Sequence, residues 1–217
     1  EHADDLPPAT LKAFQQCTAF VCERVRTFRR WVKYLNHPLA IDDMTLIEME
    51  KHDPIAGMAE MDQLKKDHQY IGIVSEAGCP GIADPGYRYA TWAHGHDMTV
   101  RSFSGPNSLL LALMNSGFSG QNFAFHGYLC AKKNLLAKDL QQLERESTQM
   151  ERAQIFIEAP YRNRQILEVA FATLSPSTRF HISVDLRTEQ EWSRSRSIAD
   201  WKKSSLPDLH TRPAVFI

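Results

Sequence analysis

The stretch SEAGCPGIADPG, residues 75–86, decides how this chain is expected to fold. It follows directly on the apolar run YIGIV at residues 70–74, and it contains three glycines, two prolines and two carboxylates. Gly78 and Gly81 allow a positive φ and a close approach of a ligand to the backbone, while the prolines stiffen the loop. Asp84 is placed to cap the next helix, with a proline in its first turn. The stretch therefore predicts a strand, a loop that can contact a ligand, and then a helix.

Short apolar runs alternate with longer amphipathic segments along the chain, which is typical of a mostly parallel sheet covered by helices. The expected strands are residues 19–22, 71–74, 99–103, 123–125, 154–158, 180–185 and 214–217. The expected helices are residues 8–16, 25–35, 55–66, 87–94, 107–115, 135–149, 162–174 and 198–203. A helix-ending glycine is followed by a second one at Gly120, where the chain can turn. We therefore expect two α/β domains, residues 1–120 and 121–217, that meet at a cleft.

The amino-acid composition excludes several classes of protein function. The longest apolar stretch, residues 109–114, is far shorter than the roughly 20 residues of a membrane-spanning helix, so no contact with a membrane is expected. A formal net charge of −1 excludes a globally basic nucleic-acid binder. The four cysteines lack the paired spacing of a zinc site, which indicates reduced thiols in a cytoplasmic protein without a metal.

The two ends of the sequence support two further predictions. The first residues show no signal peptide, since no basic region is followed by an apolar one. The sequence does not begin with methionine, and it stops inside an expected strand at residues 213–217. We therefore expect it to be a piece of a longer chain.

One local basic cluster lies in the expected helix at residues 25–35. Arg26, Arg29, Arg30 and Lys33 gather on the side opposite to its apolar residues. Such a stripe is either a solvated helix face or a set of contacts to phosphates.

Two loops at strand ends indicate a ligand site, because ligands of open α/β sheets bind at the carboxyl ends of the strands. Glu76 follows one strand and is either an acceptor for ribose hydroxyls or a surface glutamate. A second loop, residues 104–108, follows the expected strand at 99–103 and opens the next helix. The sequence has neither a P-loop nor a Gly-x-Gly-x-x-Gly motif. Serine, asparagine and backbone amides without a lysine suit an uncharged adenosine with an amino-acid tail, which indicates S-adenosylmethionine.

Five motifs, taken in order, resemble the tetrapyrrole methylase superfamily. They are Glu23-x-x-Arg26-x-x-Arg29-Arg30, the loop at 75–86, Gly105-Pro-Asn-Ser, His126-Gly-Tyr-Leu129 and Glu158-Ala-Pro-Tyr-Arg162. Within this superfamily the chain is similar to the branch that methylates the ribose 2′-hydroxyl of a cytidine in small-subunit ribosomal RNA. The resemblance implies a homodimer of two α/β domains, with a mostly parallel sheet in the first, a mixed sheet in the second, and S-adenosylmethionine in the cleft.

The resemblance also implies roles for particular residues. The implied cofactor-binding residues are Ser75, Glu76, Ala77, Gly78, Pro80, Ile82, Asp84, Gly105, Pro106, Asn107, Ser108, Tyr128, Pro160 and Pro213. The implied contacts to the phosphates of ribosomal RNA are Arg26, Arg29, Arg30, Lys132 and Lys133.

The chain also departs from the pattern of the ribosomal RNA branch. Glu76, Cys79 and residues 159–161 stand where that branch usually has Ser-Asp-Ala-Gly-Thr-Pro and Glu-Ser-x-His-Arg. Three alternatives therefore stay open: a methylase of ribosomal RNA, a methylase of a corrin or porphyrin precursor, and a binding module without catalysis. The family's first strand and its proline-rich loop do not precede Pro8 here, and we attribute this to omitted residues rather than to a genuine loss.

Methyl transfer from a sulfonium to an oxygen requires alignment and a site free of competing water. A ribose hydroxyl also needs a base to take its proton. Glu158 is the first candidate for that base, and Tyr161 or His126 is the second. The structural alternatives are that Glu158 only pairs with Arg162, and that His126 is a satisfied core histidine.

Overall fold

The computed structural model describes residues 5–49 and 58–217. The chain divides into two compact units, unit 1 (Glu1–Asn107) and unit 2 (Ser108–Ile217). The division falls before Gly120, because helix α5 (Ser108–Ser116) packs its residues Leu109 and Leu113 on Ile155 of the second sheet. No helix in the described residues has the length and apolar character needed to cross a membrane.

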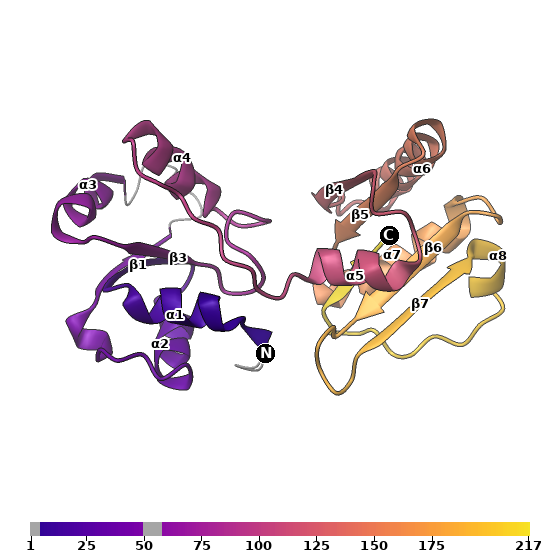
Figure 1. Ribbon diagram of the computed structural model, residues 1–217. Coiled ribbons are helices and arrows are strands. Elements are labelled where there is room, and N and C mark those ends of the chain that lie inside the picture. Colours follow the sequence, from indigo (N-terminus) through magenta and orange to yellow (C-terminus); the bar gives the residue numbers. More distant parts are fainter. Residues whose placement is uncertain (1–4, 50–57) are drawn as a thin grey trace. The chain divides into compact units, whose positions relative to one another are not determined.

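Unit 1 is built on a three-stranded parallel sheet with the order β2-β1-β3 (Figure 1). Its strands are β1 (Ala19–Cys22), β2 (Thr45–Glu48) and β3 (Ile71–Val74). The central strand β1 is buried along its whole length, as expected of a parallel strand that is covered on both faces. The apolar runs at β1 and β3 predicted strands, and both predictions are confirmed.

Helices cover both faces of this sheet. They are α1 (Pro8–Gln16), α2 (Val25–Tyr34), the short 3-10 helix η2 (Ile41–Asp43), α3 (Met58–Asp67) and α4 (Tyr87–Gly95). Phe20 and Cys22 of β1 pack against Phe28 and Val32 of α2 on one face. Ala19 and Val21 pack on the other face, in a cluster with residues of α3 and α4. Residues 55–57 of the helix expected at 55–66 lie outside the described residues.

The strand expected at residues 99–103 is wrong. The segment is exposed and has no strand assignment, and no strand of the described residues pairs with it. An extended segment needs a neighbour to satisfy its backbone amides and carbonyls, and its apolar pattern alone cannot supply one. The opposite error occurred at β2, where only Ile47 is buried and the polar ends hid the strand.

Unit 2 is built on a mixed five-stranded sheet with the order β4-β5-β8-β6-β7 (Figure 1). Its strands are β4 (Phe123–Tyr128), β5 (Ala153–Ile157), β6 (Arg179–Val184), β7 (Trp192–Ser197) and β8 (Ala214–Phe216). Strands β4 and β5 are parallel, and the other three neighbouring pairs are antiparallel. The mixed α/β fold expected for this half is confirmed. Strand β7, with the sequence WSRSRS, was missed because serine and arginine give no apolar alternation.

The helices of unit 2 also cover both faces of its sheet. They are α5, α6 (Lys133–Met150), the 3-10 helix η3 (Pro160–Arg162), α7 (Asn163–Thr173) and the short α8 (Ile198–Trp201). Leu140 of α6 and Ile166 of α7 pack against Phe156 and Ile182 of the sheet. Helix α5 packs on the opposite face, where Leu113 contacts the cluster around Ile155.

His181 of β6 is fully buried in a chain of polar contacts beneath α5. Its Nδ1 lies 2.8 Å from Ser195 Oγ, and its Nε2 lies 2.7 Å from Ser183 Oγ. Ser195 Oγ donates its own proton to the Ser116 carbonyl at 2.5 Å, so Nδ1–H must donate to Ser195. Nε2 then accepts from Ser183. The neutral imidazole of His181 thereby links β6 to β7 and, through Ser195, to the end of α5.

Acid is expected to destabilise unit 2 through His181. Burial lowers the pKa of His181 from 6.5 to about 4. Between these values the unfolded chain binds a proton that the folded chain excludes, so the free energy of unfolding is highest above pH 6.5 and falls as the pH drops toward 4. Urea unfolding across this range should show the fall, and His181→Gln should make it shallower. Equal pH slopes for the two proteins would contradict the role of His181.

Candidate functional site

The loop at residues 75–86 is closed by its own hydrogen bonds at the carboxyl end of β3. Gly81 N–H and Gly86 N–H both donate to Asp84 Oδ1, at 2.8 and 2.6 Å, and Ser75 Oγ donates to the Gly78 carbonyl at 3.1 Å. Asp84 thus folds the loop and does not cap α4, whose N-cap is Gly86 without a side-chain bond. The expected role of Asp84 as a helix cap is wrong, because its Oδ1 already accepts two N–H groups inside the turn.

The backbone of this loop has the conformation that its glycines were expected to allow. Gly78 and Gly81 have φ values of +79° and +82°. A Cβ placed on Gly78 would meet no atom of the described chain within 4 Å. The backbone at Gly78 is therefore open to a ligand, which fits a cofactor held by main-chain contacts.

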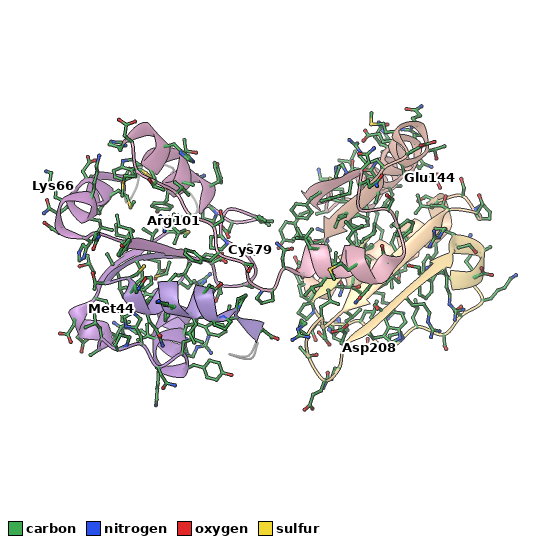
Figure 2. All side chains as sticks on the ribbon, in the orientation of Figure 1. Met44, Lys66, Cys79, Arg101, Glu144 and Asp208 are labelled. Carbon is green, nitrogen blue, oxygen red and sulfur yellow. The ribbon has the colours of Figure 1, made fainter. Side chains whose placement is uncertain are left out.

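The two loops expected to bind the cofactor lie side by side in unit 1. Cys79 Sγ donates to the Gly105 carbonyl at 3.8 Å, and Thr10 Oγ1 donates to the Ser104 carbonyl at 2.7 Å. Cys79 is labelled in Figure 2. Asn107 at the end of the second loop is buried, with 7% of its surface exposed. Ala77, Pro80, Ile82 and Pro106 belong to the same two loops, and Ser108 begins α5 of unit 2.

Glu76 is tied to the start of α2. Its Oε1 accepts from Thr27 Oγ1 at 2.8 Å, and its Oε2 lies 3.5 Å from Arg24 Nε. Its backbone N–H donates to Glu23 Oε2 at 2.9 Å. The side chain is 39% exposed, and each carboxylate oxygen can accept a second hydrogen bond. Glu76 therefore has local partners that the sequence did not reveal, and it still has room for a hydroxyl donor.

The expected phosphate contacts are divided between the two units. On α2 of unit 1, Arg26, Arg29 and Arg30 are exposed. In unit 2, Lys132 is exposed, and Lys133 Nζ forms an exposed ion pair with Glu168 Oε2 at 3.3 Å.

Unit 2 gathers the other expected residues along one edge of its sheet. Strands β4 and β5 are parallel and β8 runs antiparallel to β5, so Tyr128, Pro160 and Pro213 share the edge at which β4 and β5 end and β8 begins. Tyr161 in η3 lies at the same edge. Tyr128 is 65% and Tyr161 is 69% exposed. These phenol groups are accessible to a substrate.

Glu158 is buried in an ion pair at this edge. Its Oε2 lies 3.1 Å from Arg162 Nη2, and its Oε1 accepts from the Ala159 N–H at 2.8 Å. Arg162 Nη2 also donates to the Cys130 carbonyl at 3.2 Å. Only 1% of the Glu158 side chain is exposed. Oε1 accepts a hydrogen bond and Oε2 faces the guanidinium of the ion pair, and this geometry favours the structural alternative over the role of a base.

His126 of β4 has a partner on the neighbouring strand. Its Nε2 lies 2.6 Å from Gln154 Oε1, so Nε2–H is the donor. The ring is partly buried. The remaining ring nitrogen, Nδ1, is the atom that can take a proton.

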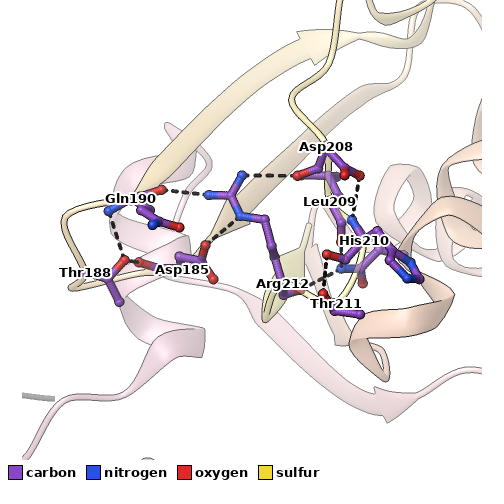
Figure 3. Close-up of polar contacts among 9 residues, drawn as sticks. Asp185, Thr188, Gln190, Asp208, Leu209, His210, Thr211 and Arg212 are labelled. Atoms are coloured by element: carbon purple, nitrogen blue, oxygen red, sulfur yellow. Dashed lines mark hydrogen bonds and ion pairs between the residues drawn. The ribbon is translucent and has the colours of Figure 1, made fainter.

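An Arg212 network, which the sequence did not reveal, fixes the turn before β8. Figure 3 shows the Arg212 guanidinium between two loops: Nε donates to Asp185 Oδ2 at 2.6 Å, Nη2 to the Gln190 carbonyl at 2.8 Å, and Nη1 to the Asp208 carbonyl at 3.2 Å. Asn163 at the start of α7 donates to the Arg212 carbonyl at 2.7 Å. These bonds fix Arg212, the residue directly before Pro213. Asp185 after an apolar strand was the available signal, but its partner lies 27 residues away.

A cavity of about 210 Å³ lies at the opposite edge of the same sheet. It is lined by residues near the amino ends of β5 and β6, including Gln154, Arg179 and Phe180, and by the end of α6. None of the residues expected at the site lines it.

Comparison with known proteins finds several methyltransferases that are similar to this chain. No family model matches it. It is 29% identical over 165 residues to the ribosomal RNA small subunit methyltransferase I of Mesomycoplasma conjunctivae. The aligned residues make up 76% of this chain and 65% of that protein. The protein of the same name from Thermotoga maritima is 33% identical over 130 residues, which cover 57% and 55%. The Synechocystis protein is 37% identical over 94 residues, which cover 43% and 32%. The chain thus spans between about a third and two thirds of the length of these relatives.

Two solved structures match nearly the whole chain. The methyltransferase CobJ aligns with a TM-score of 0.62 and 16% identity, over 100% of this chain and 89% of CobJ. Diphthine synthase aligns with a TM-score of 0.62 and 11% identity, over 98% and 84%. The chain has the tetrapyrrole methylase fold. The resemblance expected from the five sequence motifs is confirmed, and the tetrapyrrole methylase fold accounts for the parallel sheet of unit 1 and the mixed sheet of unit 2.

Proposed function

We propose that this chain is an S-adenosylmethionine-dependent methyltransferase that methylates a ribose 2′-hydroxyl of ribosomal RNA. The observation that carries the proposal is the pair of loops at the carboxyl end of β3, joined by the bond from Cys79 to Gly105 and free of a phosphate-binding lysine. The names of its relatives support the same activity. The proposal includes a homodimer in the cytoplasm.

The cofactor, when bound, supplies a methyl group on a positively charged sulfur. The proposed contacts in unit 1 are the open backbone at Gly78, the neighbouring Ser75, Ala77, Pro80, Ile82 and Asp84, and the loop from Gly105 to Asn107. Glu76 is proposed to accept ribose hydroxyls while it keeps its bond to Thr27. In unit 2 the proposed contacts are Ser108, Tyr128, Pro160 and Pro213.

The protein's part in the chemistry is alignment and proton removal. We propose His126 Nδ1, or Tyr161 Oη in the phenolate form, as the group that takes the hydroxyl proton, because both side chains are accessible at least in part. Glu158 is proposed to hold η3 and Tyr161 in place through Arg162. Arg26, Arg29, Arg30, Lys132 and Lys133 are proposed to bind the phosphates of the RNA.

The test is incubation of the chain with labelled S-adenosylmethionine and undermodified small ribosomal subunits, followed by nucleoside analysis. Label in 2′-O-methylcytidine is the expected result. Label in an added corrin or porphyrin precursor, and none in RNA, would replace ribosomal RNA by a tetrapyrrole substrate. Calorimetry with S-adenosylmethionine separates the third alternative, because tight binding without transfer to either acceptor indicates a binding module.

A further inference from the structure

Helix α2 carries an aromatic pair beside its basic stripe. Phe28, Val32 and Leu35 are buried on one side of the helix, and the cationic side chains point to the other. Trp31 and Tyr34, one turn apart, lie on the flank between these two sides. Their ring centroids are 6.1 Å apart at an interplanar angle of 70°. Tyr34 is 49% exposed.

The cations beside this pair are available to an external anion. They are Arg26, Arg29, Arg30 and Lys33, all exposed. Among residues 5–49 and 58–217, no carboxylate forms an ion pair with any of them. Arg30 makes only a 3.4 Å contact to Thr27 Oγ1 on its own helix. Four unneutralised charges on three turns of helix favour a polyanion as the partner.

The aromatic flank indicates which polyanion fits. Cations alone suit any anionic chain, whereas a flat exposed ring next to cations also suits an unpaired base, which stacks on the ring while the cations hold the neighbouring phosphates. A duplex keeps its bases stacked on one another and cannot use the ring. An acidic peptide has charge without planar bases.

We propose that Trp31 and Tyr34 form a stacking platform for an unpaired base of single-stranded RNA, with the stripe Arg26, Arg29, Arg30 and Lys33 binding the flanking phosphates. This platform rests on the proposed function for its RNA substrate, and it adds a recognition surface to it. Tyr34 supplies the contact area, and Trp31 supports its ring from the preceding turn.

The experiment is fluorescence anisotropy with a labelled twelve-nucleotide single-stranded RNA at several salt concentrations. Tyr34→Ala should weaken binding about 5- to 100-fold with an unchanged salt dependence, since it removes stacking and no charge. Tyr34→Phe should bind like the original chain. Arg30→Gln should lower the salt slope by about 0.7, the value for one phosphate contact on a single strand. Tyr70→Ala, which removes another exposed tyrosine of unit 1, is the matched control and should change nothing.

Trp31 gives an independent signal. RNA should quench tryptophan fluorescence, and Trp31→Phe should remove that quenching. Thermal melting of each variant by circular dichroism checks that the fold is intact.

Several outcomes overturn the platform: no binding of the RNA by the original chain, equal binding by Tyr34→Ala, equal binding of single-stranded RNA and a duplex of the same length, or displacement by polyglutamate at equal charge. The proposed function fails separately. RNA binding that depends on Tyr34 but is accompanied by no methyl transfer to small subunits would keep the platform and reject the methyltransferase.

Discussion

Arg162→Met is expected to lower the free energy of unfolding by about 3–5 kcal/mol, because it leaves the Glu158 carboxylate charged and buried without its partner. The Glu158 side chain is 1% exposed, so water cannot replace the guanidinium. Urea denaturation measures the loss directly. The size of this effect separates a structural carboxylate from a solvated one.

Helix α7, which follows η3 directly, offers a matched control. Arg164 forms an ion pair with Glu168, with the same spacing of four residues and 3.4 Å between Nε and Oε1, but these side chains are 89% and 52% exposed. Arg164→Met should therefore cost less than about 1 kcal/mol. The double variant Glu158→Gln, Arg162→Met should recover part of the loss. Equal losses for Arg162→Met and Arg164→Met would mean that the burial of Glu158 has no energetic consequence.

Gly72→Ala is expected to destabilise unit 1 by up to about 3 kcal/mol, because the new methyl overlaps a core ring. A Cβ at Gly72 would lie 2.5 Å from Phe20 Cδ1 and 2.6 Å from Phe20 Cε1. Phe20 is fully buried between Phe14 and Phe28, at centroid distances of 5.2 and 4.7 Å. Thermal or urea unfolding measures the effect.

Gly95→Ala is the control for this substitution. Gly95 is the last residue of α4, and a Cβ there would meet nothing within 4 Å. Alanine is the better helix former, so the variant should be neutral or more stable by up to about 1 kcal/mol. A stable Gly72→Ala protein would show that the Phe20 ring can shift.

Local pattern predicted much of the fold. Apolar runs predicted β1 and β3. Amphipathic periodicity predicted α2, α6 and α7, and the predicted ends of these helices lie within two residues of the observed ends. The local sequence pattern failed where pairing with a neighbouring strand decides the structure. Strand β7 has almost no apolar side chains and forms because β6 lies beside it. Residues 99–103 include the apolar Val100 and Phe103 but have no neighbour among the described strands.

The candidate site also has features that the sequence could predict and features that it could not. The glycine-rich loop could be predicted, because positive φ is a property of single residues such as Gly78 and Gly81. The partners of Glu76 could not, since Thr27 comes from a helix 49 residues earlier. The pairing of Glu158 with Arg162 was foreseen as an alternative because its spacing is local, but only the fold shows that the pair is buried.

The position of β8 has a consequence for how the protein is made. Among the described strands, β8 comes last in the sequence, yet it lies between β5 and β6 and joins them through pairs such as Ile182 with Phe216. During synthesis on the ribosome, the halves of the second sheet stay unjoined until β8 has emerged. Among the described strands of unit 1, the last in sequence, β3, is added at an edge of the sheet, so this sheet can form earlier. Unit 2 is therefore the slower part to mature, and a nascent chain stopped before Ala214 should be bound by chaperones or digested by proteases.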